Sequence, residues 1–236
     1  MRKILFVLLV VLVGIKTVNA EENYYVNSYG VAFTKEEYEF FTEMYFDGYQ
    51  EYMTHDDFNY FDKSEMHVNN VVTNYSYPTI IPMAESVTGT KKTLKISKVD
   101  SGSDPKIVVV AEWFQPPTTK SNDVIGARFV GTDLLELPGT NLLNKNGSKF
   151  YENIDRQNNG FGQTVLISGT NISLTQTYKV RKGGTVYASY QHAKQVISTV
   201  NSRKYTISAD GYGGVFKFSG TAVSVYDNSQ GVSMSV

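Results

Sequence analysis

Short apolar segments recur along most of the chain, from about residue 66 to the C-terminus. They are rich in Val, Ile, Thr and Tyr, and turn-forming Gly, Asn, Ser and Asp residues separate them. No helical pattern long enough to cross over a sheet intervenes, so an alternating α/β fold is not expected. The pattern predicts a mainly β fold over residues 66–236, an antiparallel β-sandwich or a barrel-like domain.

The stretch "KIVVVAEW", residues 106–113, has apolar side chains at both alternating sets of positions. One set ends on Trp113, the only tryptophan of the chain, and the other set ends on Glu112. Since a strand with two apolar faces is covered on both sides, we expect this strand to lie inside the fold and to emerge at its end. Two roles remain open for Trp113, a plug that closes the core or an exposed platform for a ligand.

Two later stretches predict features that bear on function. Residues 139–162 are polar and rich in Asn and Gly, which indicates a long irregular connection with one helical turn in "SKFYENIDR", and such connections often carry function. Residues 171–191 alternate apolar and polar positions and predict a hairpin that turns at Gly183 and Gly184. Such hairpins insert into bilayers in β-pore formers, although alternation is equally typical of a half-buried hairpin.

The region before residue 66 has a helical rather than a β pattern. Thr34 followed by Glu37 is typical of a capping box, and it predicts a helix of about five turns. Aromatic residues then recur at three- and four-residue steps and form a stripe that we expect to pack on the rest of the protein. The stripe consists of Tyr38, Phe41, Tyr45, Tyr49 and Tyr52. A second short helical turn is expected after Thr54.

The formal net charge of -1 hides a division along the chain. Residues 21–67 contain 12 acidic residues and 2 lysines, a net charge of -10, whereas residues 68–236 contain 11 acidic and 17 basic residues, a net charge of +6. The two parts attract each other, but exposed charge pairs are weak and screened by salt. We therefore expect residues 21–65 to be held on the β domain by packing, as a lid, with a removable pro-segment as the alternative.

The first twenty residues have the layout of a secretory signal peptide. Two basic residues precede an apolar stretch, and small residues precede an expected cut after Ala20. The apolar stretch is shorter than the roughly 20 residues that a membrane-spanning helix needs. The sequence thus predicts three parts, a signal peptide at 1–20, an acidic helical segment at 21–65 and the β domain at 66–236, in a protein secreted to the extracellular space.

Catalytic and metal-binding signatures do not occur in the sequence. There is no cysteine, which excludes disulfides and thiol chemistry, and none of the three histidines lies at metal-ligand spacing. No nucleophile elbow is present either. We expect no cofactor, no metal and no catalytic residues, although an unrecognised extracellular hydrolase stays open because two carboxylates would suffice for one.

The composition favours a non-catalytic binding or surface-interaction protein. Tyrosine, hydroxyl and amide side chains are abundant and suit an extracellular glycan or a protein surface, while the scattered basic residues do not indicate a nucleic-acid groove. A β-pore-forming or membrane-active protein remains an alternative, with membrane insertion disfavoured by the marginal hairpin length. The candidate ligand-binding residues are Trp113, Glu112, Asp123, Arg128 and Tyr151.

Two stretches resemble uncharacterised small exported proteins of Gram-positive bacteria. One is "YGVAFTKEEYEFFTEMYFDGYQEYMT", and the other combines a tryptophan, proline, serine and Asp-Val between Trp113 and Val124. The resemblance covers about a quarter of the chain and implies no function.

Overall fold

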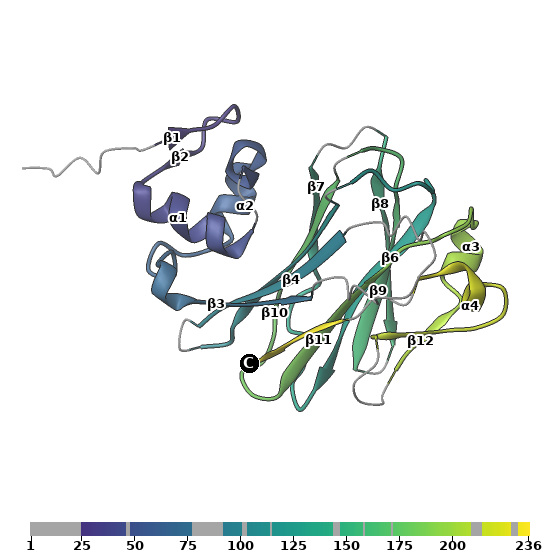
Figure 1. Ribbon diagram of the computed structural model, residues 1–236. Coiled ribbons are helices and arrows are strands. Elements are labelled where there is room, and N and C mark those ends of the chain that lie inside the picture. The colour runs from purple at the N-terminus through teal and green to yellow at the C-terminus, as the bar shows by residue number, and fades with distance from the viewer. Residues whose placement is uncertain are drawn as a thin grey trace, which may run out of the picture.

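Two five-stranded antiparallel sheets dominate the computed structural model (Figure 1). It describes residues 25–45, 48–76, 92–100, 103–113, 115–143, 147–157, 159–170, 172–208, 214–227 and 231–236. The predicted signal peptide lies outside these residues. The expectation of a mainly β protein with antiparallel sheets is confirmed.

The first sheet has the order β3-β4-β5-β10-β7, and the second has the order β14-β11-β6-β9-β8. The strands of the first sheet are β3 (Val71–Ser76), β4 (Lys92–Val99), β5 (Lys106–Trp113), β10 (Ser173–Lys179) and β7 (Gly139–Leu143). Those of the second are β14 (Val232–Ser235), β11 (Thr185–Gln191), β6 (Asn122–Val130), β9 (Gly160–Leu166) and β8 (Lys149–Gln157).

The inner faces of the two sheets share one apolar cluster. Ile107 and Val109 reach it from the first sheet, and Ile125 and Phe161 reach it from the second. The opposite face of β5 is also buried, because Val108 and Val110 belong to a different cluster on the outside of the first sheet. The prediction of a strand buried on both sides is therefore confirmed.

The predicted hairpin of residues 171–191 is wrong. β10 pairs with β5 and β7, whereas β11 pairs with β14 and β6, so the turn at Gly183 and Gly184 carries the chain from one sheet to the other. Gly184 has a φ of 85°, and a Cβ there would lie 2.3 Å from the carbonyl oxygen of Val130. The alternating pattern was real, but alternation does not say which partner a strand has.

Residues 139–162 also differ from the expectation, since they contain β7, β8 and the start of β9 rather than an irregular loop. β8 is the edge strand of the second sheet, and its side chains are exposed or half-buried along its length. An edge strand with little buried surface needs few apolar residues, so its composition resembled that of a loop.

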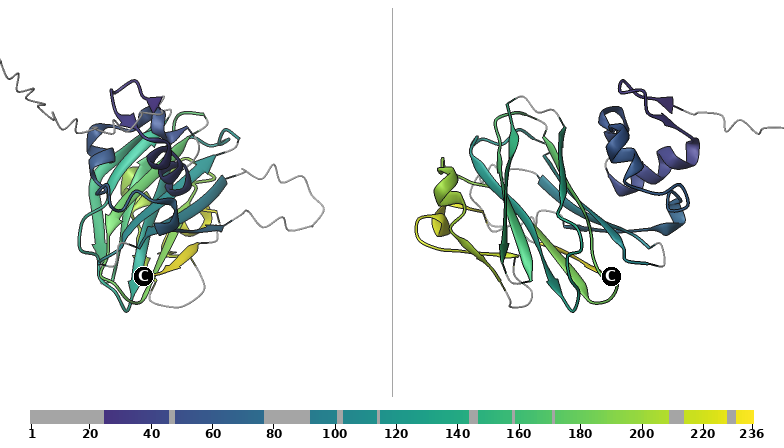
Figure 2. Two further views of the ribbon diagram at one scale, coloured as in Figure 1. Left: turned by 90° about the vertical axis from the view of Figure 1, so that its left-hand side faces the viewer. Right: turned by 180° about the vertical axis from the view of Figure 1, so that it is seen from behind.

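The N-terminal segment, residues 25–70, lies against the outer face of the first sheet (Figures 1 and 2). Its elements are β1 (Tyr25–Val26), β2 (Ala32–Phe33), α1 (Lys35–Met44), η1 (Tyr49–Tyr52), α2 (His55–Asn59) and η2 (Val68–Asn70). Capping boxes begin α1 at Thr34 and α2 at Thr54. Most of the apolar cluster under this segment comes from the segment itself, with Val99, Val108 and Val110 contributed by the sheet.

The predicted five-turn helix is shorter than expected. α1 ends at Met44, the backbone is extended at Tyr45, and Gly48 has a left-handed φ of 84° before the 3-10 turn. Lys95 donates a hydrogen bond to the carbonyl oxygen of Tyr45 at this end of the helix. The aromatic stripe is consequently divided: Phe41 and Tyr45 are buried, whereas Tyr52 is 44% exposed.

A smaller layer covers the outer face of the second sheet. It consists of α3 (Thr199–Ser202), β12 (Tyr205–Ile207), β13 (Phe216–Phe218) and α4 (Ala222–Val225). Tyr205 lies directly on β9, where a Cβ at Gly162 would come within 2.3 Å of the Tyr205 hydroxyl. The molecule thus has coverings on the outer faces of both sheets.

Candidate functional site

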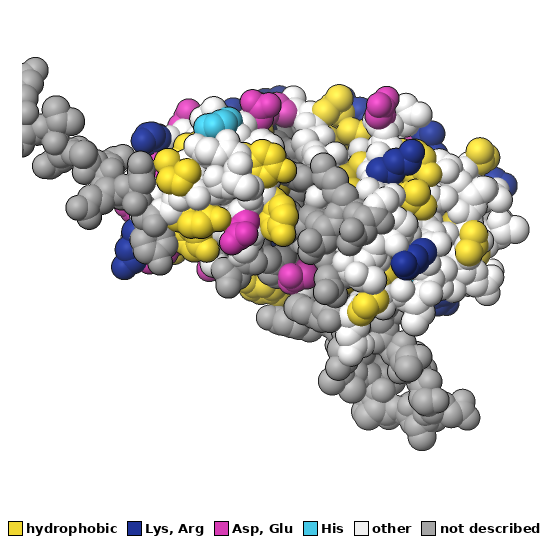
Figure 3. All heavy atoms as spheres, turned by 90° about the horizontal axis from the view of Figure 1, so that it is seen from above, with side chains coloured by type: hydrophobic (Ala, Val, Ile, Leu, Met, Phe, Trp, Pro, Cys, Tyr) yellow, Lys and Arg dark blue, Asp and Glu magenta, His cyan; other side chains and the backbone are white. Residues whose placement is uncertain are grey.

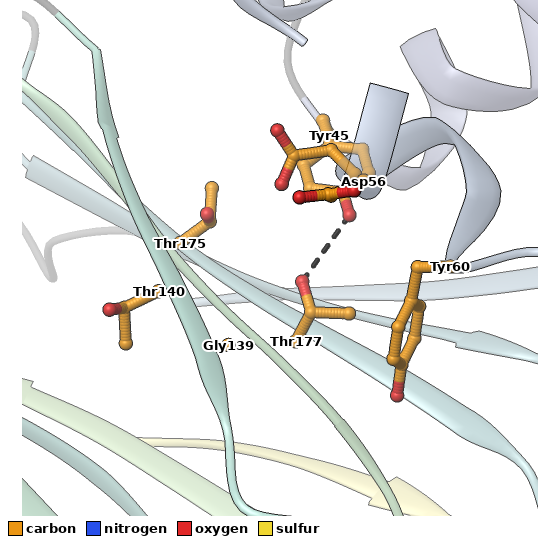
Figure 4. A pocket seen from close by; sticks show the side chains of 8 residues that line it. Tyr45, Asp56, Tyr60, Gly139, Thr140, Thr175 and Thr177 are labelled. Atoms are coloured by element: carbon orange, nitrogen blue, oxygen red, sulfur yellow. Dashed lines mark hydrogen bonds between the residues drawn. The ribbon is translucent and has the colours of Figure 1, made fainter. Parts of the chain in front are cut away.

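A cavity of about 250 Å³ lies where the N-terminal segment meets the first sheet (Figure 4). We call it the seam pocket. Its lining residues are Tyr45, Asp56, Asp57, Tyr60, Gly139, Thr140, Thr175 and Thr177. The first four come from the N-terminal segment and the last four from the edge of the sheet formed by β7 and β10.

The capping box of α2 fixes the acidic wall of the seam pocket. Asp57 Oδ2 accepts hydrogen bonds from the Thr54 backbone N–H at 2.9 Å and from the Thr54 hydroxyl at 2.7 Å. Asp56 precedes it in the first turn and is exposed. Both carboxylates lie near the positive end of the helix, where negative charge is favoured. Asp57 therefore holds the helix start, and Asp56 is the acid presented to solvent.

The sheet wall of the seam pocket carries hydroxyl groups. Thr175 and Thr177 are two positions apart on β10, so they share the outer face of the sheet. The hydroxyls of Tyr45 and Thr177 are 3.3 Å apart, the hydrogen bond drawn in Figure 4, and those of Tyr49 and Thr175 are 3.5 Å apart. Tyrosines of the segment and threonines of the sheet thus meet through polar contacts beside the pocket.

The hollow continues along the sheet at Gly139. Gly139 pairs with Thr177 across the β7–β10 ladder, so a side chain at residue 139 would share the outer face with Thr177. A Cβ at Gly139 would have its nearest neighbour at 3.8 Å, the Thr177 carbonyl oxygen. The absence of a side chain at Gly139 therefore enlarges the pocket, although neither the backbone conformation nor a close neighbour requires a glycine there.

Tyr60 forms the side of the seam pocket beside the strands. Its hydroxyl donates to Glu136 Oε2 at 3.4 Å, and Lys106 Nζ lies 5.2 Å from the ring centre and donates to the Tyr60 carbonyl at 2.7 Å. Burial, followed by the negative charge of Glu136, raises the pKa of the Tyr60 hydroxyl. This hydroxyl stays protonated at neutral pH and remains a hydrogen-bond donor.

The charge of the surface around the seam pocket follows the division seen in the sequence. Figure 3 shows most of the visible acidic side chains over the N-terminal segment and most of the lysine and arginine side chains over the sheets. The described lining residues of the pocket include two carboxylates and no basic side chain. The pocket lining provides carboxylate oxygens as hydrogen-bond acceptors, the hydroxyl groups of threonine and tyrosine, and two tyrosine rings.

Trp113 is 2% exposed, which fits the core-closing role of the two that the sequence left open and not the exposed platform. Its Nε1 donates to the Tyr190 hydroxyl at 3.0 Å, and the Tyr190 hydroxyl donates in turn to Asp123. Asp123 is fully buried and also contacts His192 Nδ1 at 2.9 Å. Trp113 and Asp123 were both candidate residues, but the sequence could not bring them together, because they lie on different strands and Tyr190 on a third.

The other candidate residues are dispersed. Arg128 is buried, donates to the carbonyl of Ser208 at 2.9 Å and lies 4.3 Å from the Tyr187 ring centre, so it is a structural residue rather than a free ligand contact. Glu112 is half-buried at the end of β5, where burial raises its pKa and the charge of Lys95 lowers it. Tyr151 is half-buried on β8, and its hydroxyl accepts from Thr199 at 3.2 Å. The five residues do not form one site.

Within the described part of the chain, no group of three or more His, Cys, Asp or Glu residues could hold a metal ion. Over the same residues, no helix has the length and apolar character needed to cross a membrane.

Comparisons with known proteins found no matching family model and no matching curated protein. Among solved structures, the chain matches the KRT10-binding region domain of the pneumococcal serine-rich repeat protein PsrP weakly, with a TM-score of 0.29 and 12% sequence identity. The match covers 51% of this chain and 86% of that domain. A likeness at this level assigns neither fold nor function.

Proposed function

We propose that this protein is an exported, non-catalytic binding protein whose seam pocket holds a hydroxyl-rich ligand, such as a terminal sugar residue of a glycan. The observation that carries the proposal is the lining of the cavity, which brings carboxylates, hydroxyls and tyrosine rings from two distant parts of the chain together. Small-ligand sites in proteins are commonly concave and combine ring surfaces with a few convergent polar groups.

Each wall of the pocket suits one feature of a sugar. Sugar hydroxyls donate to a carboxylate such as Asp56, and the half-buried hydroxyl of Thr177 can both donate and accept. The half-buried ring of Tyr60 offers flat, stiff contact area for the C–H face of a pyranose, and the buried Tyr45 contributes its hydroxyl to the wall. A protein surface that presents hydroxyl side chains is the second candidate ligand.

The geometry favours binding over hydrolysis. Glycosidases place two carboxyl groups on opposite sides of the bond that breaks. In the seam pocket the two acids are consecutive residues of one helix, and Asp57 is already bound to the backbone and hydroxyl of Thr54. Asp56 alone has no acid partner across the cavity among the described lining residues.

The proposal extends to the organisation of the chain. We propose that residues 66–236 form a β-sandwich, that residues 21–65 close one wall of the site as a lid, and that residues 1–20 are cleaved as the protein is secreted. The shared core of the two sheets and the contacts of the N-terminal segment support the first two statements. Sequencing the N-terminus of the exported protein tests the third.

Binding is tested by filling the seam pocket with a larger side chain. Gly139→Leu adds a side chain on the pocket face where the backbone leaves room, and Asn153→Leu adds the same side chain at an exposed position of edge strand β8 as a matched control. We expect glycan-array signals, checked by saturation-transfer NMR, to disappear in the first variant and to persist in the second. Equal binding by both variants, or no glycan binding by the native protein, would contradict the proposal, and binding only to a protein array would favour the second candidate.

A further inference from the structure

A buried lysine and an aspartate far away in the sequence meet at one end of the first sheet. Lys92 begins β4, and Asp227 follows α4 near the C-terminus. Lys92 Nζ and Asp227 Oδ2 are 2.7 Å apart, and the side chains are only 10% and 26% exposed. The pair therefore links the first sheet to the layer that covers the second.

Aromatic rings shield the amine from water. Lys92 Nζ lies 4.7 Å from the ring centre of Tyr190 and 5.8 Å from that of Trp113, and both rings are buried. Burial lowers the pKa of Lys92, although the charges of Asp227 and Asp123 act in the opposite direction. Burial of the amine therefore favours its neutral form, which is the nucleophilic one.

The carboxyl group of Asp227 is held in place by the backbone. The N–H of His192 donates to Asp227 Oδ1 at 3.0 Å, which leaves Oδ2 facing Lys92. The backbone N–H of Asp227 donates back to the His192 carbonyl at 2.9 Å. The His192 ring is fixed in turn by Asp123. A fixed N–H aimed at a carboxyl oxygen is the arrangement that stabilises a developing oxyanion.

We propose that the side chains of Lys92 and Asp227 join in an intramolecular isopeptide bond. The Lys92 ammonium first gives a proton to Asp227 Oδ2, and the neutral amine then attacks Cγ, with the charge that develops on Oδ1 stabilised by the His192 N–H. The Cγ–Oδ2 bond breaks as the departing hydroxyl takes a proton from the nitrogen and leaves as water. The step needs no oxidant, reductant or further reactant, because only one water is lost.

Proximity is what makes this condensation feasible without an activated acid. Holding two reacting groups in contact converts a bimolecular step into an intramolecular one and supplies a large effective concentration. His192 acts as a positioning residue through its backbone, and Asp123 acts through the His192 ring.

A second buried pair in the same chain is a built-in control. Lys106 Nζ lies 2.6 Å from Glu65 Oε2 with similarly low exposure. There, the oxygen that faces the amine also accepts the Asp62 backbone N–H at 2.9 Å, and Lys106 donates to the Tyr60 carbonyl at 2.7 Å. Lys92 likewise donates to a backbone carbonyl, that of Tyr190 at 3.2 Å, so the difference lies in the acid. At Glu65 the backbone N–H holds the same oxygen that faces the amine and would have to leave, and we therefore expect this pair to remain an ion pair.

Mass spectrometry of the full chain tests the proposal. We expect a proteolytic digest of the native protein to contain a branched peptide that joins the segments around Lys92 and Asp227, lighter by one water than its two parts. After unfolding and reductive methylation, Lys92 should be the lysine that stays unmodified. Lys92→Arg and Asp227→Ala should lack the branched peptide, and Lys106→Arg should retain it.

The native protein alone decides the question, so poor folding of a variant does not obscure it. A methylated Lys92 together with linear peptides of full mass would overturn the proposal and leave an ion pair. Loss of water mapped to Lys106 and Glu65, or to a single linear peptide, would overturn it as well. Glycan binding uses other residues, so the outcome is independent of the function proposed for the seam pocket.

Discussion

The stability of the N-terminal segment should depend strongly on one buried aromatic side chain, that of Phe41. It is fully buried, and its ring lies between 5.0 and 6.2 Å from five other aromatic rings of the segment. Phe41→Ala removes those contacts and leaves a cavity, for which a loss of about 3 to 5 kcal/mol is typical. We expect that loss in the free energy of unfolding of the segment, and it is a large fraction of the roughly 5 to 15 kcal/mol by which an ordinary domain is stable.

Urea unfolding followed by two signals measures the effect. Far-UV circular dichroism reports both the helices and the sheets, whereas the fluorescence of Trp113, the only tryptophan, reports the core between the sheets. Because α1 packs mainly against its own segment, the variant should show an early transition by dichroism before Trp113 responds. Tyr52→Ala, at a position 44% exposed, should change stability by about 0.5 kcal/mol or less.

Salt separates packing from charge in the same experiment. Apolar contacts are insensitive to moderate salt, whereas attraction between the acidic segment and the basic sheets is screened over about 10 Å at 0.1 M. We expect the loss caused by Phe41→Ala to stay constant as salt is added. A loss below about 1 kcal/mol, or one that disappears with salt, would refute the claim that packing dominates.

Three further predictions concern single contacts. Burial lowers the pKa of Lys95 to about 8, below that of a lysine in the unfolded chain. Between these two pKa values the unfolded chain binds more protons than the folded one, so the free energy of unfolding should rise as the pH increases above 8. The difference between the urea midpoints of the native protein and Lys95→Met, followed against pH, measures this effect. Thr34→Ala removes the α1 cap and should cost about 1 kcal/mol in urea unfolding. Gly162→Ala should lower the melting temperature and Tyr205→Phe should not rescue it, because the new Cβ also meets two ring carbons of Tyr205 at 2.7 and 2.8 Å.

The sequence predicted local structure well where a single segment determines it. The capping box at Thr34, the helical turn after Thr54 and the double burial of β5 follow from neighbouring residues and were expected. The length of α1 and the pairing of β10 were not, because they depend on contacts with remote strands, such as the bond from Lys95 to the end of the helix. The polar edge strand β8 could not be told from a loop by composition.

The candidate site was even harder to predict, because it depends on contacts between segments that are distant in the sequence. Thr175 and Thr177 have no chemistry that distinguishes them from other strand threonines, and they become part of a pocket only because α2 lies over them. Trp113 was conspicuous as the only tryptophan, yet Tyr190 and His192 enclose it. A weak signal was available in Asp56 and Asp57, whose charge exceeds what one helix cap requires.

The crossing of the chain between sheets at Gly183 and Gly184 has a consequence for how the protein folds. β5 acquires β10 as its neighbour, and β6 acquires β11, only after a long intervening stretch has been synthesised, and β14 at the extreme C-terminus supplies an edge of the second sheet. Pairings so distant in sequence make folding slow, since loops must close before contacts form. A chain whose two sheets assemble this late keeps its strands unpaired for longer during synthesis than a chain built from consecutive hairpins.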